Sequence, residues 1–263
     1  MDWQERSRRL VGDDQIRNLE QAHVILFGLG GVGSFAAEAL ARSGLGALSL
    51  VEYDRVTDAN RNRQLPALCS TVGREKIEVA GARLKDINPN LKLFCYPVKM
   101  TGDNLGAILD GQGLPLDFIA DAIDDLPAKT ALILASVHKG IPIISSMGAG
   151  FRLDPSQLAI GDILETHTCP LARKLRRNLR EAGVGEGIPV VWSKEKPFPR
   201  LGDEGRAVPL GDQKAVGENG AHAAMGGHQE EEGRRGPASM IFVPAAAGLL
   251  MASYIVARLM RNG

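Results

Sequence analysis

The stretch from His23 to Ser34 constrains the fold most, because it is typical of a strand, a tight turn and the start of a helix. His23 to Phe27 is a short apolar run, and glycines then follow in the spacing G-x-G-x-x-G. Glycine permits the positive φ angles of such a turn and lets backbone N–H groups approach a phosphate at the helix N-terminus. The sequence therefore predicts a nucleotide-binding loop at Gly28, Gly30, Gly31 and Gly33, without saying which nucleotide it binds.

Strand and helix signals alternate after this loop, which predicts an α/β, Rossmann-like fold with a mostly parallel sheet and helices on both faces. Two later strands flank a basic helix and predict an antiparallel C-terminal extension. The expected strands are 23–27, 47–53, 117–125, 141–145, 158–163 and 188–193, and the expected helices are 34–43, 73–87, 127–139 and 170–180.

Length and composition fit one α/β domain over residues 1–263, although two small domains would also fit. Lys plus Arg and Asp plus Glu number 31 each, so a nucleic acid partner would have to be met by a local patch. The three cysteines, Cys69, Cys95 and Cys169, form no Cys-x-x-Cys pair. Together with an N-terminus unlike a signal peptide, this usage favours a cytoplasmic location.

Two segments near the C-terminus have unusual composition. Residues 200–237 lack aromatic residues and are rich in Gly, Ala and charge, so we expect a flexible loop there. Met240 to Val256 carries no charge over 17 residues, which raises the alternative of a membrane span. Because this stretch is short for a span and contains Pro244 and Gly248, we expect a buried strand and helix and no membrane span.

Polar side chains suited to phosphate chemistry follow the predicted strands. Glu52 stands 19 residues beyond Gly33, where an acidic side chain accepts hydrogen bonds from a ribose. Asn60 and Arg63 lie in a loop rich in amides and guanidinium groups, and Lys76 falls in the first turn of the next predicted helix. Three carboxylates come from the end of the 117–125 strand, namely Asp121, Asp124 and Asp125.

This set of residues fits adenylylation by ATP better than hydride transfer. When a carboxylate attacks the α-phosphorus and pyrophosphate leaves, cations must neutralise the developing charge and an aspartate can hold Mg²⁺. Hydride transfer usually needs a proton relay, and no histidine lies near these segments. Asp124 has a structural alternative, since it could cap the helix expected from Pro127.

Four motifs in this order resemble the ubiquitin-activating-enzyme-like superfamily that includes ThiF and MoeB. They are Gly28-Leu-Gly-Gly-Val-Gly33, Asn60-Arg-Asn-Arg-Gln64, Gly73-Arg-Glu-Lys76 and Ala122-Ile-Asp-Asp125. Segments 147–150, 154–155, 170–176 and 190–197 are similar to the TcdA (CsdL) branch of that superfamily. Outside the loop at 200–237, the resemblance covers nearly all of residues 6 to 256.

The TcdA resemblance implies an ATP-dependent tRNA threonylcarbamoyladenosine dehydratase. In this reaction ATP converts the carboxylate of the modified adenosine next to the anticodon into an acyl-adenylate. The neighbouring carbamoyl group then closes onto it and AMP leaves. A tRNA carrying threonylcarbamoyladenosine, ATP and Mg²⁺ are therefore the implied partners and cofactors. A monovalent cation and a cysteine-desulfurase or sulfur-acceptor partner remain open.

The resemblance also implies roles for individual residues. Gly31 lies against ATP and Glu52 takes the ribose, although the superfamily usually has Asp at that position. Asp124 is the metal or leaving-group carboxylate, and Arg9 matches an arginine that superfamily dimers insert into the partner's site, which implies a homodimer. The phosphate contacts fall to Asn60, Arg63 and Lys76.

Two other functions stay open on the sequence. The chain could adenylylate the C-terminus of a ubiquitin-like sulfur-carrier protein, as ThiF and MoeB do, but it lacks their paired Cys-x-x-Cys zinc ligands. It could also bind nucleotide without turnover. The basic helix from Arg173 to Arg180 is either a solvated face or a phosphate contact for tRNA.

Overall fold

The computed structural model describes residues 2–198, 200–201, 207–208 and 238–261. Its centre is a seven-stranded sheet in the order β3-β2-β1-β4-β5-β7-β6. Neighbouring strands are parallel except β6 and β7, which pair antiparallel at one edge. The strands are β1 (His23–Phe27), β2 (Ala47–Val51), β3 (Lys92–Tyr96), β4 (Phe118–Asp121), β5 (Ile143–Ser146), β6 (Leu158–Asp162) and β7 (Pro189–Ser193). The predicted Rossmann-like, mostly parallel sheet with an antiparallel extension is confirmed.

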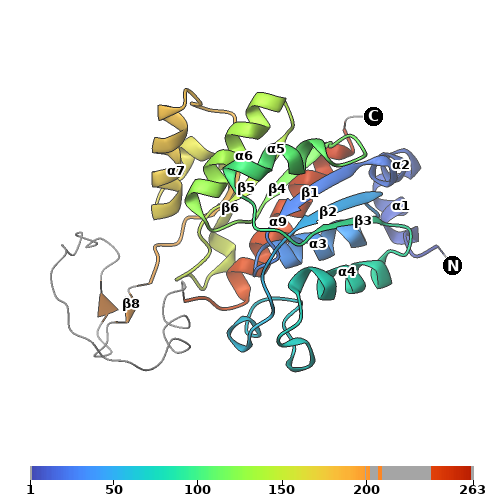
Figure 1. The fold of residues 1–263 in the computed structure, drawn as a ribbon, viewed down its shortest axis with the longest axis horizontal. Helices are drawn as coiled ribbons and strands as arrows, with labels where there is room; N and C mark the ends of the chain where they lie inside the picture. The colour runs from blue at the N-terminus through green and yellow to red at the C-terminus, as the bar shows by residue number, and fades with distance from the viewer. Residues whose placement is uncertain (1, 199, 202–206, 209–237, 262–263) are drawn as a thin grey trace.

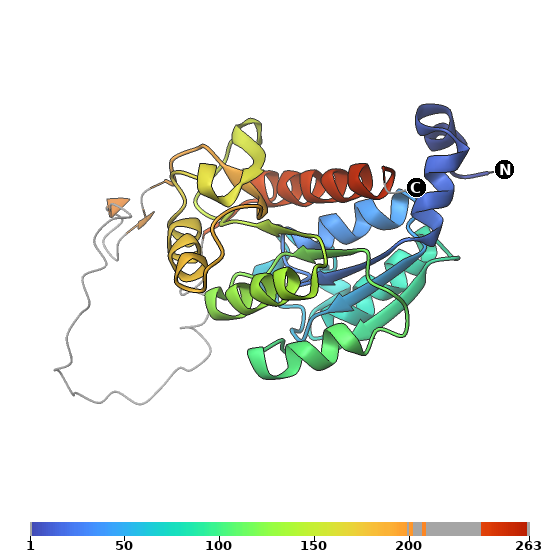
Figure 2. The same cartoon turned by 90° about the horizontal axis from the view of Figure 1, so that it is seen from above.

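Helices cover both faces of this sheet (Figures 1 and 2). One layer contains α2, α3, α4 and α9, and the opposite layer contains α5, α6 and α7. The α-helices are α1 (Glu5–Val11), α2 (Asp13–Gln21), α3 (Gly33–Arg42), α4 (Lys76–Ile87), α5 (Gly102–Asp110), α6 (Leu126–Lys139), α7 (Pro170–Glu181) and α9 (Phe242–Leu259). Short 3₁₀ helices are η1 (Asp58–Asn60), η2 (Cys69–Thr71), η3 (Pro155–Gln157) and η4 (Ile163–Glu165).

The predicted elements exist, with shifts at some ends. The helix expected from Gly73 begins only at Lys76, because Gly73 has φ +86° and the preceding residues pair with the chain after β2. The strand expected over 117–125 ends at Asp121. The segment 200–237 lies mostly outside the described residues, and within it Arg200–Leu201 (β8) pairs antiparallel with Ala207–Val208 (β9).

Met240 to Val256 was expected to give a strand and a helix, and the structure corrects this to the single helix α9. Pro244 does not interrupt the helix, because it lies in the first turn, where a missing N–H breaks no intrahelical bond. By length and composition α9 could cross a membrane. In this fold, however, it lies along α3 and buries one side against the sheet, as Figure 2 shows. The expectation of a buried core element is therefore confirmed.

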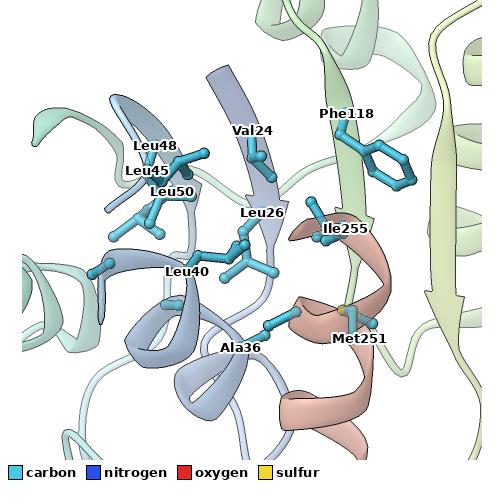
Figure 3. Close-up of a cluster of buried hydrophobic side chains, with 14 of the residues drawn as sticks. Val24, Leu26, Ala36, Leu40, Leu45, Leu48, Leu50, Phe118, Met251 and Ile255 are labelled. Carbon is cyan, nitrogen blue, oxygen red and sulfur yellow. The ribbon is translucent and has the colours of Figure 1, made fainter. Parts of the chain in front are cut away.

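The larger hydrophobic cluster lies between the sheet and the helices α2, α3, α4 and α9. Figure 3 shows Leu26 of β1, Leu40 of α3, and Met251 and Ile255 of α9 in this cluster. All four side chains are fully buried. The core therefore fixes α3, whose first turn carries the glycine loop, through its contact with α9.

The α3–α9 contact predicts a stability difference between two helical glycines. A Cβ at Gly248 of α9 would lie 2.3 Å from the carbonyl oxygen of Val32, whereas one at Gly106 of α5 would meet nothing within 4 Å. We expect Gly248→Ala to lower the free energy of unfolding by about 1–3 kcal/mol through overpacking. Gly106→Ala should raise it by about 0.5–1 kcal/mol. Urea denaturation measures both, and equal effects of the two substitutions would contradict the packing of α9 against α3.

Candidate nucleotide-binding site

A cavity of about 640 Å³ lies at the carboxyl ends of β1, β2, β4 and β5. This is the edge at which doubly wound folds bind ligands, and the volume is that of a small-molecule site. Its wall combines the glycine loop, the ends of the strands, the loop at 146–152 and the first residues of α7. Seven of the residues predicted from the sequence line it, namely Gly28, Gly30, Gly31, Glu52, Arg63, Lys76 and Asp124.

The glycine loop forms the predicted strand–turn–helix. Gly28 has φ +88°, a conformation that L side chains rarely adopt, and its N–H donates to the carbonyl of Val51 at 2.9 Å. Gly33 does not line the cavity. Its role is close packing, since a Cβ there would lie 1.8 Å from the carbonyl oxygen of Gly28. The backbone of the loop is thereby held in a close-packed turn at the start of α3.

Glu52 is buried at the end of β2, and its carboxylate is held by backbone donors. Oε2 accepts from the N–H of Leu29 at 2.7 Å. Oε1 accepts from Tyr53 at 2.8 Å and from Asp54 at 2.9 Å. Glu52 therefore connects the glycine loop to the end of the next strand, a function that the sequence alone did not reveal.

Two cations reach the cavity from different segments. Lys76 is the first residue of α4, is buried, and its Nζ lies 2.9 Å from Oδ2 of Asp54. Arg63 donates to the carbonyl of Ala59 at 2.8 Å and to Oδ1 of Asn62 at 2.9 Å, and it forms no ion pair with a described residue. Its positive charge is therefore available to an anion in the cavity.

Asn60 lies outside the cavity wall. Its Oδ1 accepts from the backbone N–H of Thr57 at 3.2 Å and so caps η1. In this structure Asn60 stabilises the loop that carries Arg63, and the predicted phosphate contact stays a prediction.

Asp124 and Asp125 follow β4 and have different surroundings. Asp125 caps α6 by accepting from the N–H of Ala128 at 2.8 Å, so the cap that was considered for Asp124 belongs to its neighbour. Asp124 is exposed, lines the cavity and accepts no hydrogen bond from any described residue. Its carboxylate is therefore free for a cation or a ligand.

The acids at this edge affect Tyr53, whose side chain also lines the cavity. Burial of the ring raises the pKa of the Tyr53 hydroxyl, and the nearby carboxylates of Asp54, Glu52, Asp124 and Asp125 raise it further. The carboxylates of Glu52, Asp54, Asp124 and Asp125 therefore lie near one another between β2 and β4. A divalent cation would be attracted to the same place.

Asp121 ends β4 at the predicted edge of the sheet but, unlike Asp124 and Asp125, it does not line the cavity. It is fully buried, and Oδ2 accepts from Lys129 Nζ at 2.7 Å and from Ser145 Oγ at 2.6 Å. Lys129 Nζ also donates to the carbonyl of Ser146 at 3.0 Å. This network joins β4, β5 and α6 next to Ala122, Ala128 and Ser146, which line the cavity.

Two further residues of the cavity wall were missed by the sequence reasoning. Arg152 is buried, and its described acceptors are the backbone carbonyls of Gly148, Gly150, Thr168 and Glu195. Gln64 is buried, and its Oε1 has no hydrogen-bond partner in the part of the chain that the structure describes. The motif ending at Gln64 was the only sequence signal for either residue, and burial and missing partners become visible only in three dimensions.

Arg9 does not reach the cavity of its own chain. It lies on α1, is 75% exposed and pairs with Glu5 of the same helix. Figure 1 shows α1 beside the start of β1, at the end of the sheet opposite to the glycine loop. Any contact of Arg9 with a nucleotide site therefore requires a second copy of the chain.

The described residues contain no group of three or more His, Cys, Asp and Glu side chains that could hold a metal ion by itself. A single free carboxylate beside a phosphate cradle still fits Mg²⁺, which is commonly held by one or two carboxylates together with substrate phosphates. Asp124 meets this description.

Comparison with known proteins identifies the family. The model of the ThiF family matches residues 4–262, almost the whole chain. The chain belongs to the ThiF family.

Individual relatives of this ThiF-family protein match it over different shares of its length. The tRNA threonylcarbamoyladenosine dehydratase of Bacillus subtilis is 37% identical over 257 residues, which cover 98% of this chain and 94% of that protein. The solved structure of the E. coli tRNA N6-threonylcarbamoyladenosine dehydratase TcdA in complex with ATP has a TM-score of 0.79 and 31% identity, covering 100% of this chain and 99% of that one. The sulfur carrier protein adenylyltransferase of Thermus thermophilus is 34% identical over 57% of this chain and 53% of its own length.

The buried pair beneath the cavity gives a stability prediction. Lys129→Met leaves the Asp121 carboxylate buried without its cation, so we expect it to lower the free energy of unfolding by about 3–5 kcal/mol. Lys139→Met on the same helix is the matched control, because its ion pair with Asp110 is exposed and should contribute less than about 1 kcal/mol. Chemical denaturation measures both. If Lys129→Met lowers the free energy of unfolding no more than Lys139→Met does, the Asp121–Lys129 pair does not stabilise this part of the fold.

Proposed function

We propose that this ThiF-family protein is an ATP-dependent tRNA threonylcarbamoyladenosine dehydratase, organised as one adenylylating domain over residues 1–263. Full-length similarity carries the proposal, since the match to the Bacillus subtilis dehydratase covers 98% of this chain and 94% of that protein. The cavity supports it with a glycine loop and with two side chains, Arg63 and Asp124, that form no ion pair with any described residue.

Different residues of the cavity bind different parts of ATP. The N–H groups of the glycine loop, with Gly31 in the wall, cradle the phosphates at the start of α3. Glu52 accepts from the ribose. Arg63 and Lys76 approach the phosphates from the other side, and Asn60 holds the loop of Arg63 in place.

Adenylylation proceeds by attack of the substrate carboxylate on the α-phosphorus, which forms a P–O bond and breaks the bond to the leaving pyrophosphate. Arg63 and Lys76 neutralise the charge that develops on the oxygens. The carbamoyl group of the modified adenosine then attacks the activated carbonyl, and AMP leaves with the carboxylate oxygen. The net change in the tRNA is loss of water and closure of a ring.

Asp124 would hold Mg²⁺, and the ion would supply charge neutralisation on the phosphates. A cytoplasmic location fits a tRNA substrate. A monovalent cation and a sulfur-acceptor partner remain open, and among the described residues Cys169 is the cysteine that lines the cavity.

Activation of a ubiquitin-like sulfur-carrier protein is the alternative. It is supported by the Thermus thermophilus relative, which matches little more than half of each chain. Mass spectrometry of tRNA nucleosides separates the two functions. The dehydratase removes one water from threonylcarbamoyladenosine only when ATP is present, whereas a carrier-activating enzyme leaves the nucleoside unchanged.

Arg63→Ala should lower the rate of ATP-dependent dehydration by about 10²- to 10³-fold, because a charge-neutralising donor is lost from the transition state. Arg61→Ala is the matched control, since Arg61 lies two residues away in the same loop, is exposed and pairs with Asp58. Asp124→Asn should lose activity similarly, with Asp86→Asn on the exposed side of α4 as its control. Single-turnover assays on modified tRNA measure the rates, and full activity of Arg63→Ala or Asp124→Asn would reject the assigned function of that residue.

An Arg9 side chain that acts in the site of the partner subunit predicts that two inactive variants restore activity when they are mixed. We propose that a homodimer places Arg9 of each chain at the site of the partner subunit, so Arg9→Ala and Arg63→Ala should each be inactive alone. In a mixed dimer the Arg9→Ala chain keeps its own Arg63 and receives Arg9 from its partner. After exchange of equal amounts, half of the dimers are mixed and each has one competent site, so about a quarter of wild-type activity should return. Absence of any recovery after verified subunit exchange would exclude the trans arrangement.

A further inference from the structure

Helix α7 separates its charged and apolar residues onto opposite faces. Ala172, Leu175 and Leu179 are buried in the cluster beneath the helix. The exposed cations Arg173, Arg177 and Arg180 follow at helical spacing on the outer face, with Lys174 beside them. We call Arg173, Lys174, Arg177 and Arg180 the α7 cationic face.

These cations have little to neutralise them within the described residues. Arg177 lies 3.8 Å from Glu181, and both side chains are at least 70% exposed, so this contact contributes little. Arg173, Lys174 and Arg180 form no ion pair with a described residue. Arg176 differs, because it is half-buried and donates to the carbonyl of Thr166 at 2.6 Å, bracing the preceding loop.

The α7 cationic face starts at the cavity. Cys169, Pro170 and Leu171 line the cavity, and the helix then runs away from it along the side of α6 (Figure 1). Twelve residues at 1.5 Å each make the helix about 18 Å long. A polyanion lying along this face would therefore have one end at the mouth of the cavity.

An exposed aromatic ring lies at the same mouth. Phe198 is 52% exposed, and its backbone N–H donates to the carbonyl of Phe151 at 2.7 Å. Phe151 and Pro197 both line the cavity. An exposed phenyl ring is a surface on which unpaired bases stack.

We propose that the α7 cationic face binds the sugar-phosphate backbone of the RNA substrate and that Phe198 stacks on an unpaired base beside the cavity. The proposal rests on the proposed function for the nature of the substrate. A row of cations that the described residues leave unneutralised, on a chain with equal numbers of acidic and basic residues, indicates a local contact for an anionic polymer. A membrane surface is disfavoured, because the outer face of α7 carries charged side chains in place of the apolar ones that insert between lipids.

The test measures affinity of the full-length protein for a labelled RNA hairpin with an unmodified anticodon-type loop, at several salt concentrations and without ATP. The triple variant R173Q/R177Q/R180Q keeps the aliphatic stems and removes three charges. If each cation meets one phosphate, the slope of log affinity against log salt should become shallower by about 2. Affinity at low salt should fall by at least tenfold. Phe198→Ala should weaken binding to the hairpin by about 5- to 100-fold and leave binding to a blunt RNA duplex unchanged.

The matched control is R17Q/R42Q/K92Q, which removes three exposed cations from α2, α3 and the start of β3. It should leave both affinity and salt slope unchanged, and every variant should retain wild-type affinity for ATP. Wild-type affinity and slope in the α7 triple variant would overturn the backbone contact. Equal losses from the control variant would overturn it as well.

Failure of the proposed function gives a different result. If the wild-type protein never dehydrates modified tRNA but the α7 variants still lose the hairpin, the RNA surface stands and the dehydratase assignment falls. If dehydration is observed and the α7 variants keep their affinity for RNA, the surface falls and the function stands. Wild-type affinity of Phe198→Ala for the hairpin would contradict the proposed stacking of Phe198 on a base.

Discussion

The buried ion pair between Asp121 and Lys129 is the interaction on which the geometry of the cavity depends. Both side chains are inaccessible to water, so each charge would be very unfavourable without the other. The pair joins the end of β4 to α6, and Ser145 extends it to β5. Three elements that contribute to the cavity are thereby held together at their carboxyl edge.

The same aspartate shapes the loop that follows β4. Its second oxygen, Oδ1, accepts from the N–H of Ile123 at 3.1 Å, and Asp125 caps α6 two residues later. These bonds turn the chain so that Asp124, between them, lines the cavity and accepts no hydrogen bond from a described residue. Two aspartates with structural functions, Asp121 and Asp125, therefore hold Asp124 at the cavity.

Local backbone requirements made the glycine loop predictable. Gly28 has a positive φ, and Gly33 approaches the carbonyl of Gly28 closely, so both positions require glycine. The spacing of the glycines therefore predicted the conformation of the loop. The positions of Arg63, Lys76 and Asp124 followed from motif order. The inward turn of Asp121 was not predictable, because it depends on Lys129 and Ser145, which are distant in sequence. The continuity of α9 through Pro244 was missed because a proline is harmless only in the first turn, and the sequence did not fix where that turn begins.

Glu52 shows how the longer acid can serve where the superfamily usually has aspartate. Its carboxylate spans from the end of β2 to the N–H of Leu29 in the glycine loop. Oε1 already accepts two backbone N–H groups, whereas Oε2 accepts one. A carboxylate offers about four lone-pair directions, so one remains on Oε2. A ribose hydroxyl bound there would share an oxygen with the loop that cradles the phosphates. Ribose binding and loop geometry would then be coupled through a single carboxylate, and the same group would position the sugar and the phosphates relative to each other.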